Sequence, residues 1–530
     1  MATSSSTLPA ADSPAADRTP RPGGRHDAAR GRRHGVWLWP TLVSLVLSLY
    51  AIGRPVLWQD ELNTWDMVTR STAQLFDTVQ RVDAVLGGYY LLLHGWTAVF
   101  GDSATALRLP SALAMAGTAG CTALIGRRLF GARAGLAAGL LFALAPVVTR
   151  YAHEARPYAL VVLAVTASTL LLLRALDRPE SRWRWAAYGL CVAAVGLLHM
   201  VALTVLAGQL VAVAWRAREE RRIALRFGLA ALAGVAVVAP VALLGRAQAG
   251  RQISWIPRPD VWSLVTFLPQ LYASALVAGA VTTLAVLAWG ERRAGSPRPG
   301  AVSGPGPGLG SRPGARGGLL GVSALAVLPP LLLWAVSHGD VSYFYFRYLL
   351  FTLPAWAVLA GAGLAGIARP KARGVVAAVL VALVVLTLQD QQAVRRPYAH
   401  FWHGIDFEGA ARTIETYHRP GDAVVFDRGD DYWRMLDVGV RFYLRDELRP
   451  RDVFLATAAA DRADLWSTEC PDPAACLRGE QRIWLVVPGD AADPLDALPA
   501  EQARALRARY TATGTERLTG VTVALLVRTG

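Results

Sequence analysis

The sequence has 530 residues, 53% of them hydrophobic and 18% charged, with a mean hydropathy of +0.33. A soluble protein of this length carries more charge, so the composition predicts a membrane protein with many spans. The net charge of +15 is typical of nucleic-acid binding. The basic residues, however, stand in short clusters between apolar runs, as the positive-inside rule requires, so we expect membrane lipids and no nucleic acid as partners.

The first 35 residues are rich in Ser, Pro, Ala and Arg, which predicts a disordered, basic tail in the cytoplasm. The helix Val36–Gly53 then exits outward, and a polar loop, 54–85, follows. The next apolar segment, 86–100, is short for a span. Counting it as one would put the basic cluster at 126–133 outside, so we predict an interfacial or re-entrant helix there.

One assignment of spans places all of the later basic clusters in the cytoplasm, with outer loops between them. It predicts about eleven spans within a transmembrane domain, 36–388. The Gly/Pro-rich stretch 290–317 is predicted to be a flexible cytoplasmic linker. The same assignment places the N-terminus inside and residues 389–530 outside.

Residues 389–530 differ from the apolar part. They contain strand-like runs at Ala423–Asp427, Ile483–Val487 and Val521–Val527, and a helical stretch at Phe407–His418 precedes the first. We therefore predict a small extracytoplasmic α/β domain.

Four cysteines are present. Cys121 and Cys191 stand in apolar runs and are predicted core residues. Cys470 and Cys476 stand in the tail, where an oxidising compartment would let them pair, so we predict a disulfide.

Adjacent carboxylates open the first outer loop, in the segment WQDELNTWD (58–66). Glycosyl transfer needs a base to take the proton of the acceptor hydroxyl, and carboxylates serve this role in many sugar enzymes. Asp60 and Glu61 are therefore catalytic candidates. The alternative is an ordinary solvated loop start.

The next outer loop carries RYAHEARPY (150–158) before a new apolar run. Charges at a membrane edge are functional by default, so Glu154 is a further catalytic candidate, and Arg156 and Tyr158 are substrate-binding candidates. The alternative is a snorkelling Arg paired with a Glu as an anchor.

The segment DAVLGGYYLLLH (83–94) contributes Asp83 as a substrate-binding candidate. His94 lies on an apolar helix, where a hydrogen-bonded core histidine is the commoner outcome. His199 ends an apolar run on the outer side and is the better substrate-binding candidate, although a structural role is equally compatible with its position.

An arginine surrounded by aromatic residues occurs in YFYFRY (343–348), at another outer boundary. A guanidinium suits a lipid phosphate, and aromatic rings suit the headgroup level, so Arg347 and Tyr348 are substrate-binding candidates. A plain aromatic belt with a snorkelled Arg is the alternative. The sequence has no P-loop and no GxGxxG after a strand, so we expect no nucleotide-sugar donor and no ATP.

The ordered set of motifs resembles the bacterial GT-C glycosyltransferases of family 39 and the related Rgt-like type. These are relatives of the protein O-mannosyltransferases and of the aminoarabinose transferases. The resemblance covers roughly residues 36–390 and rests on four segments: WQDE (58–61), YYLLLHGWTAVFGDSATALRLPSALA (89–114), GRRLFG (126–131) and RYAHEARPYAL (150–160). The segment 407–426 is similar to the tail of actinobacterial members.

This resemblance implies a GT-C fold, a polyprenyl-phosphate sugar donor carrying mannose or a similar sugar, and inverting transfer to a glycan, lipid or protein. The catalytic Asp of the family corresponds to Asp60, with Glu61 beside it; the second-loop acid corresponds to Glu154 and the outer histidine to His199. Many relatives carry a His or Pro pair where this chain has Leu86-Gly87-Gly88. That departure puts a metal role of this loop in doubt, and a divalent cation stays open as a cofactor.

Two other classes of function fit the spans. A lipid or glycan transporter, or flippase, predicts inverted internal repeats, and the sequence contains none that we recognise. A structural partner in polymer export would use the outer tail only as a binding module. Neither explains why acids are concentrated at the outer loops.

Overall fold

The computed structural model describes residue 2 and residues 23–218, 220–293, 315–367, 373–398, 404–429, 432–444 and 446–529. The chain forms two compact units, residues 1–35 and 36–530; the hydrophobic cores and the cavities belong to the second. Residues 23–35 form the start of a helix, where the sequence predicted disorder. Most of the predicted linker 290–317 lies outside the described residues.

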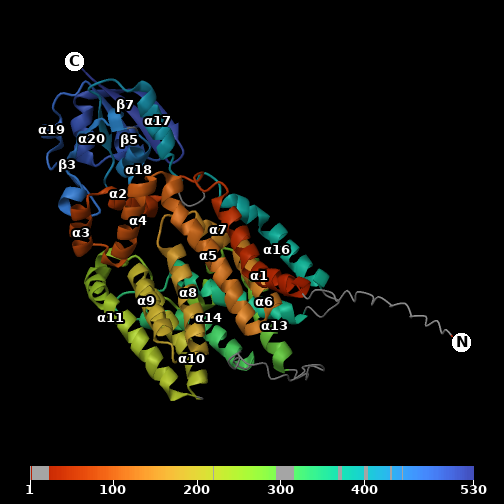
Figure 1. Cartoon of the computed structure of the whole chain (residues 1–530). Coiled ribbons are helices and arrows are strands. Elements are labelled where there is room, and N and C mark those ends of the chain that lie inside the picture. The colour runs from red at the N-terminus through yellow and green to blue at the C-terminus, as the bar shows by residue number, and fades with distance from the viewer. Residues whose placement is uncertain are drawn as a thin grey trace. The chain divides into compact units, whose positions relative to one another are not determined.

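The part of the chain before residue 394 is helical (Figure 1). Its elements, with three short 3₁₀ helices named η, are α1 (Gly23–Leu49), α2 (Gln59–Thr69), α3 (Thr72–Arg81), η1 (Ala84–Leu86), α4 (Gly87–Phe100), α5 (Ala104–Phe130), α6 (Ala132–Leu144), α7 (Pro146–Ala152), α8 (Tyr158–Asp177), α9 (Arg182–Leu198), η2 (Met200–Thr204), α10 (Val205–Ala217), α11 (Arg221–Gln252), α12 (Val261–Tyr272), α13 (Ala275–Arg293), α14 (Ala315–Val336), η3 (Phe346–Thr352), α15 (Leu353–Ile367) and α16 (Arg373–Ala393).

Among the described residues, six helices are long and apolar enough to cross a membrane, or eight if each of two bent pairs forms one span. This supports a multi-pass membrane protein, but it does not confirm the predicted eleven spans. Three predicted segments yield only shorter apolar helices, at Gly35–Leu49, Ala84–Phe100 and Ala377–Ala393. For Ala84–Phe100 this agrees with the prediction of a segment too short to span.

The two bent pairs break at a proline and at a residue with a left-handed backbone conformation. Pro146 starts α7 after a 60° bend from α6, because proline lacks the N–H donor and disfavours helical geometry at the residue before it. Ala273 has φ of 51° and separates α12 from α13, which meet at 105°.

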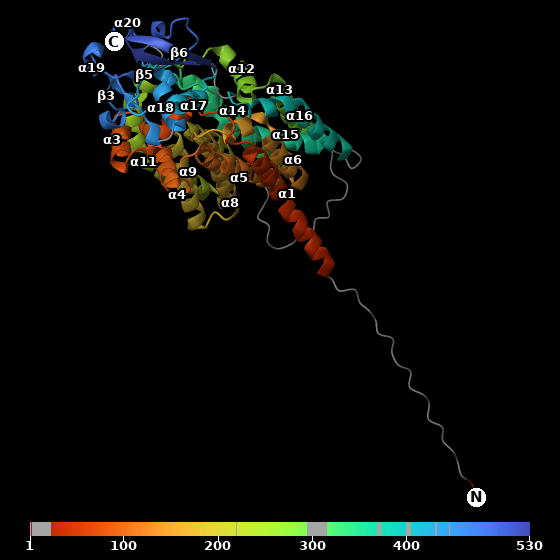
Figure 2. The ribbon, with the colours of Figure 1, turned by 90° about the horizontal axis from the view of Figure 1, so that it is seen from above.

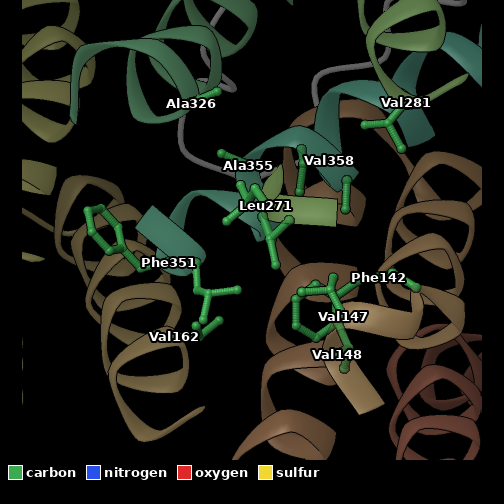
Figure 3. Packing of buried hydrophobic residues seen from close by; sticks show 14 of the residues in the cluster. Phe142, Val147, Val148, Val162, Leu271, Val281, Ala326, Phe351, Ala355 and Val358 are labelled. Carbon is green, nitrogen blue, oxygen red and sulfur yellow. The ribbon is translucent and has the colours of Figure 1, made fainter. Parts of the chain in front are cut away.

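The main hydrophobic core of the helical part is built mostly of small and branched residues (Figure 3). Phe142 of α6, Val162 of α8 and Val358 of α15 belong to it. Helices α5 and α6 approach closely because Gly135 has no side chain: a Cβ there would lie 2.5 Å from the carbonyl oxygen of Ala123. Helix α15 packs on α6 and α13, and α16 also contacts α6, so these four lie side by side (Figure 2).

The C-terminal region, residues 404–529, contains a five-stranded sheet in the order β2-β1-β5-β7-β6. Strand β1 is parallel to β2 and β5, and β7 is antiparallel to β5 and β6. Its elements are α17 (Phe407–Tyr417), β1 (Ala423–Phe426), η4 (Tyr432–Arg434), α18 (Leu436–Tyr443), η5 (Asp446–Leu448), β2 (Arg451–Asp452), β3 (Leu455–Thr457), η6 (Ala460–Arg462), β4 (Thr468–Glu469), α19 (Pro473–Cys476), β5 (Arg482–Pro488), η7 (Pro494–Ala497), α20 (Ala500–Arg507), β6 (Tyr510–Leu518) and β7 (Val521–Arg528).

The predicted helix and the three predicted strands of this region correspond to α17, β1, β5 and β7, with ends that agree within one residue. Strand β6 was not predicted, because its exposed polar side chains give no apolar signal. The predicted disulfide between Cys470 and Cys476 is formed.

A second hydrophobic core joins the C-terminal region to the helices after α1. It contains Leu62 and Trp65 of α2, Tyr90 of α4, Phe407 of α17 and Val440 of α18. The C-terminal region is therefore packed against α2, the helix that carries the predicted catalytic acids.

Candidate active site

The predicted acids Asp60 and Glu61 lie in the first turn of α2, where the helix N-terminus favours negative charge. Their side chains have different surroundings. The Asp60 side chain is 28% exposed, whereas that of Glu61 is fully buried. Consecutive residues of a helix point about 100° apart, so only one of the two acids faces the adjoining cavity.

Glu61 is held by Arg108 of α5 through two charge-assisted hydrogen bonds, of 2.7 and 2.6 Å. The backbone N–H of Ala155 donates to the same carboxylate at 2.8 Å. Arg108 also donates to the carbonyl oxygens of Ile52 and Pro55, at 3.0 and 2.7 Å. Glu61 therefore joins three segments of the chain and does not line the cavity, although the sequence made it a catalytic candidate.

Arg108 was not a sequence candidate. A charged residue within the long apolar helix α5 was the signal that could have identified it, because such residues are retained only with a partner.

Asp60 faces two guanidinium groups. Its Oδ2 lies 3.1 Å from Nη1 of Arg347 and 3.8 Å from Nε of Arg156. Nη1 of Arg156 also donates to the backbone oxygen of Asp60 and to the hydroxyl of Thr64, each at 3.4 Å. The structure thus brings together three of the predicted site residues, from α2, η3 and the loop before α8.

Aromatic rings surround the Arg347 guanidinium, as the sequence predicted, but three of the four come from other segments. Its central carbon lies 5.0 Å from the ring centroid of Tyr345, 5.5 Å from Trp58, 5.7 Å from Tyr158 and 5.8 Å from Trp255. These distances allow cation–π contacts. The rings hold the guanidinium in place beside Asp60.

The predicted residues Tyr158, His199 and Tyr348 form one aromatic group. The His199 ring centroid lies 4.8 Å from that of Tyr348 and 6.0 Å from that of Tyr158. Burial, followed by the charges of Arg156 and Arg347, lowers the pKa of His199 to about 4. His199 is therefore neutral at physiological pH and supplies a ring and a hydrogen-bonding group, not a charge.

Asp83 adopts a left-handed backbone conformation, with φ of 63°, just before η1. Its carboxylate accepts hydrogen bonds of 2.6 Å from the hydroxyl of Tyr90 and of 2.6 Å from Nε2 of Gln252. Burial raises the pKa of Asp83, and Arg156 opposes this rise. These contacts tie the loop before α4 to the end of α11.

A cavity of about 620 Å³ connects these groups. Seven predicted residues line it: Asp60, Asp83, Arg156, Tyr158, His199, Arg347 and Tyr348. The C-terminal region contributes Tyr432, Asp464, Leu465 and Trp466, none of which the sequence marked, because no local pattern relates them to the membrane helices.

Glu154 does not line this cavity. Its Oε2 accepts a 2.6 Å hydrogen bond from Arg150, and its side chain is 1% exposed. Burial raises the pKa of Glu154, and the nearby Arg150 and Arg347 lower it in part. Glu154 thus lies within electrostatic range of Arg347, behind the cavity wall.

His94, too, has a structural environment. Its ring nitrogens contact the Thr72 hydroxyl at 3.1 Å and the Val68 carbonyl oxygen at 2.8 Å.

Among the described residues, no three His, Cys, Asp or Glu side chains are placed to hold a metal ion. The immediate partners of Asp60 are two guanidinium groups, which cannot ligate a cation and repel one. This set of groups does not fit a divalent cation.

Comparison with known proteins gives the following relationships. Residues 88–243 match the model of the dolichyl-phosphate-mannose-protein mannosyltransferase family. No curated protein matches the chain in sequence. ArnT from Cupriavidus metallidurans in the apo state shares the fold, with a TM-score of 0.59 and 17% identity over 94% of this chain and 98% of that one.

Two further solved structures are similar. ArnT from the same organism bound to undecaprenyl phosphate has a TM-score of 0.59 and 16% identity, covering 92% of this chain and 97% of that one. The Archaeoglobus fulgidus oligosaccharyltransferase in complex with zinc and sulfate has a TM-score of 0.44 and 11% identity, over 92% of this chain and 72% of that one. None of these matches distinguishes an actinobacterial type. This chain therefore has the fold of ArnT, and its residues 88–243 match the model of a mannosyltransferase family.

Proposed function

We propose that this protein moves a sugar, mannose or a similar one, from a polyprenyl-phosphate donor to a hydroxyl group of a cell-envelope glycan, lipid or protein. The observation that carries the proposal is the pairing of Asp60 with Arg347 in a cavity of about 620 Å³. A carboxylate and two guanidinium groups in one cavity provide a base for the acceptor and cations for the departing phosphate.

In this mechanism Asp60 takes the proton of the acceptor hydroxyl as the oxygen forms a bond to the anomeric carbon of the sugar. The bond between that carbon and the phosphate oxygen breaks, and its electron pair leaves with the polyprenyl phosphate. Arg347 and Arg156 stabilise the charge that develops on the phosphate. Attack from the face opposite the leaving group in a single displacement inverts the configuration.

Glu61 acts differently from Asp60 in this proposal. Because it is fully buried and bound to Arg108, it positions the first turn of α2 and contacts neither substrate. Glu154 is the second carboxylate near Arg347, and we assign it to supporting the arginines. Asp83, Tyr158, His199 and Tyr348 contact the substrates as part of the cavity wall.

The proposed orientation follows the basic clusters: the N-terminus is cytoplasmic, and the C-terminal residues 389–530 form a domain at the outer face. The transmembrane domain is then residues 36–388, preceded by the cytoplasmic tail 1–35. A polyprenyl-phosphate donor is supported by the family match and by the shared fold with an ArnT that binds undecaprenyl phosphate.

The experiment uses the full chain in nanodiscs with radiolabelled polyprenyl-phosphate sugars, mannose first and then glucose and arabinose, and an envelope extract as acceptor. Wild type is compared with Asp60→Asn and with Asp77→Asn, the same change at an exposed position of α3. We expect Asp60→Asn to lower transfer by about 10²–10⁴-fold, the usual contribution of a general base, and Asp77→Asn to match wild type. Near-normal turnover of Asp60→Asn would remove Asp60 from the mechanism and make Glu154 the next candidate base.

A further inference from the structure

A second cavity, of about 430 Å³, lies between α2 and the C-terminal region. Its lining includes Asp66 of α2, Asp437 and Arg441 of α18, and Glu469 of β4. The proposed mechanism uses none of these side chains.

The two cavities share part of their walls. Tyr432, Leu465 and Trp466 line both of them. The rings of Tyr432 and Trp466 meet edge to face with centroids 4.8 Å apart. These side chains form a common aromatic boundary between the cavity of Asp60 and the second cavity.

The charges of the second cavity differ from those of a phosphate site. Two lining arginines, Arg428 and Arg441, are accompanied by three carboxylates, those of Asp66, Asp437 and Glu469. Arg428 pairs with Asp437 at 3.0 Å and with Asp452, and its Nη1 lies 3.6 Å from Glu469. Since carboxylates outnumber guanidinium groups, the lining disfavours an anion and suits a ligand rich in hydroxyl groups.

Hydrogen-bonding capacity remains in this lining. Oε1 of Glu469 is buried and accepts no hydrogen bond within the described residues, although Oε2 of the same carboxylate accepts from Gln502. In the part of the chain that the structure describes, Oε1 of Glu469 has only the ion pair with Arg428, at 3.6 Å, so it keeps capacity to accept a hydrogen bond. Carboxylates and aromatic rings in one cavity suit a sugar, because hydroxyls donate to carboxylate oxygens and the C–H face of the sugar ring packs on an aromatic side chain.

The floor of the second cavity is the helix that carries the proposed base. Asp66 is bound by Arg70 at 2.7 Å and by Arg441 from α18, and the Arg441 guanidinium carbon lies 5.4 Å from the Trp65 ring. The C-terminal region is thereby attached to α2 beyond Asp60. The second cavity and the cavity of Asp60 adjoin each other at Tyr432, Leu465 and Trp466.

We propose that the second cavity binds the acceptor and that the acceptor is a glycan, whose terminal hydroxyl passes the Tyr432–Trp466 boundary to reach Asp60. This inference rests on the proposed function, because it assigns the second substrate of the same transfer. The C-terminal region is then the part of the enzyme that selects the acceptor, whereas the membrane helices bind the donor.

The test fills the second cavity without changing the first. Ala459 lines only the second cavity, so Ala459→Trp should block it. The matched control is Ala512→Trp, the same change at an exposed position of β6. Full-length variants in nanodiscs are assayed with the radiolabelled donors above. The two acceptors are protease-treated envelope polysaccharide and the envelope protein fraction. Both come from a strain in which the gene for this protein is deleted, so that they have not been modified by it.

We expect Ala459→Trp to raise the KM for the polysaccharide by about tenfold or more and to leave the donor Kd unchanged. Ala512→Trp should leave both the polysaccharide KM and the donor Kd unchanged. Equal polysaccharide KM values for the two variants would overturn the acceptor site and leave the proposed function standing. Transfer by wild type to the protein fraction alone would overturn the glycan assignment. If wild type uses none of the donors, the proposed function fails, and the acceptor site with it.

Ala459→Leu fills less of the cavity and replaces the tryptophan variant if that variant loses donor binding. Its expected effect is a smaller rise in the polysaccharide KM at unchanged donor Kd. Loss of donor binding by this variant as well would show that Ala459 supports the first cavity, which would overturn the assignment.

Discussion

Oδ2 of Asp60 lies 3.1 Å from Nη1 of Arg347, although Asp60 lies in the first turn of α2 and Arg347 lies in η3, far along the chain. The pair places a carboxylate directly against a guanidinium that four aromatic rings hold in position. Any phosphate that reaches Arg347 therefore arrives beside Asp60.

Changing Arg347 should affect the donor more than the acceptor. Arg347→Gln removes the charge, and a hydrogen bond to a charged group contributes about 1.5–3 kcal/mol, so the donor KM should rise by about 10–100-fold. Arg347→Lys keeps the charge but lacks the planar fork, and should recover part of the loss. Steady-state kinetics with varied donor measures both. Arg258→Gln, at an exposed site, is the control; an unchanged donor KM in Arg347→Gln would contradict the assignment.

The buried pair of Glu61 and Arg108 should control stability. Arg108→Met leaves the Glu61 carboxylate buried without its partner, which costs about 3–5 kcal/mol in such pairs. The exposed pair of Glu408 and Arg412, at 2.9 Å, is the control, because Arg412→Met should cost about 1 kcal/mol or less. Thermal unfolding of the purified variants measures the difference. Equal melting temperatures for the two variants would show that Glu61 does not depend on Arg108.

The lowered pKa of His199 predicts how the stability of the folded protein changes with pH. Its folded pKa is about 4, against 6.5 for an ordinary histidine, so the unfolded chain binds more protons between these values. The contribution of His199 to stability therefore rises with pH across this window and is complete above it. The difference in melting temperature between wild type and His199→Gln should grow from pH 4.5 to 7, and a difference that shrinks would indicate a charged His199.

The proposed orientation predicts the sides on which two reporters fall. A fusion after Arg293, the last residue of α13, should report the cytoplasm, and one after Arg396, beyond α16, should report the exterior. The two fusion points lie on opposite sides only if the chain between them, which contains α14 to α16, crosses the membrane an odd number of times, once or three times. The same reading from both fusions would contradict the parity of the basic clusters.

The sequence by itself determined the class of the protein and the segments that carry its candidate site. Apolar runs and basic clusters depend on local composition, so they predicted a multi-pass membrane protein. The strands β1, β5 and β7 were also predicted, because buried strands read as short apolar runs. Seven of the nine residues selected from local motifs line one cavity.

Tertiary structure alone decided how neighbouring residues divide their roles. Asp60 and Glu61 are adjacent and chemically alike, and the packing of α2 on Arg108 turns one into the core and the other toward Arg347. It also brought Tyr432 and Trp466 of the C-terminal region to the cavity of the membrane helices. The direction of a side chain and the approach of distant segments depend on how whole helices pack, and no local pattern in the sequence records that packing.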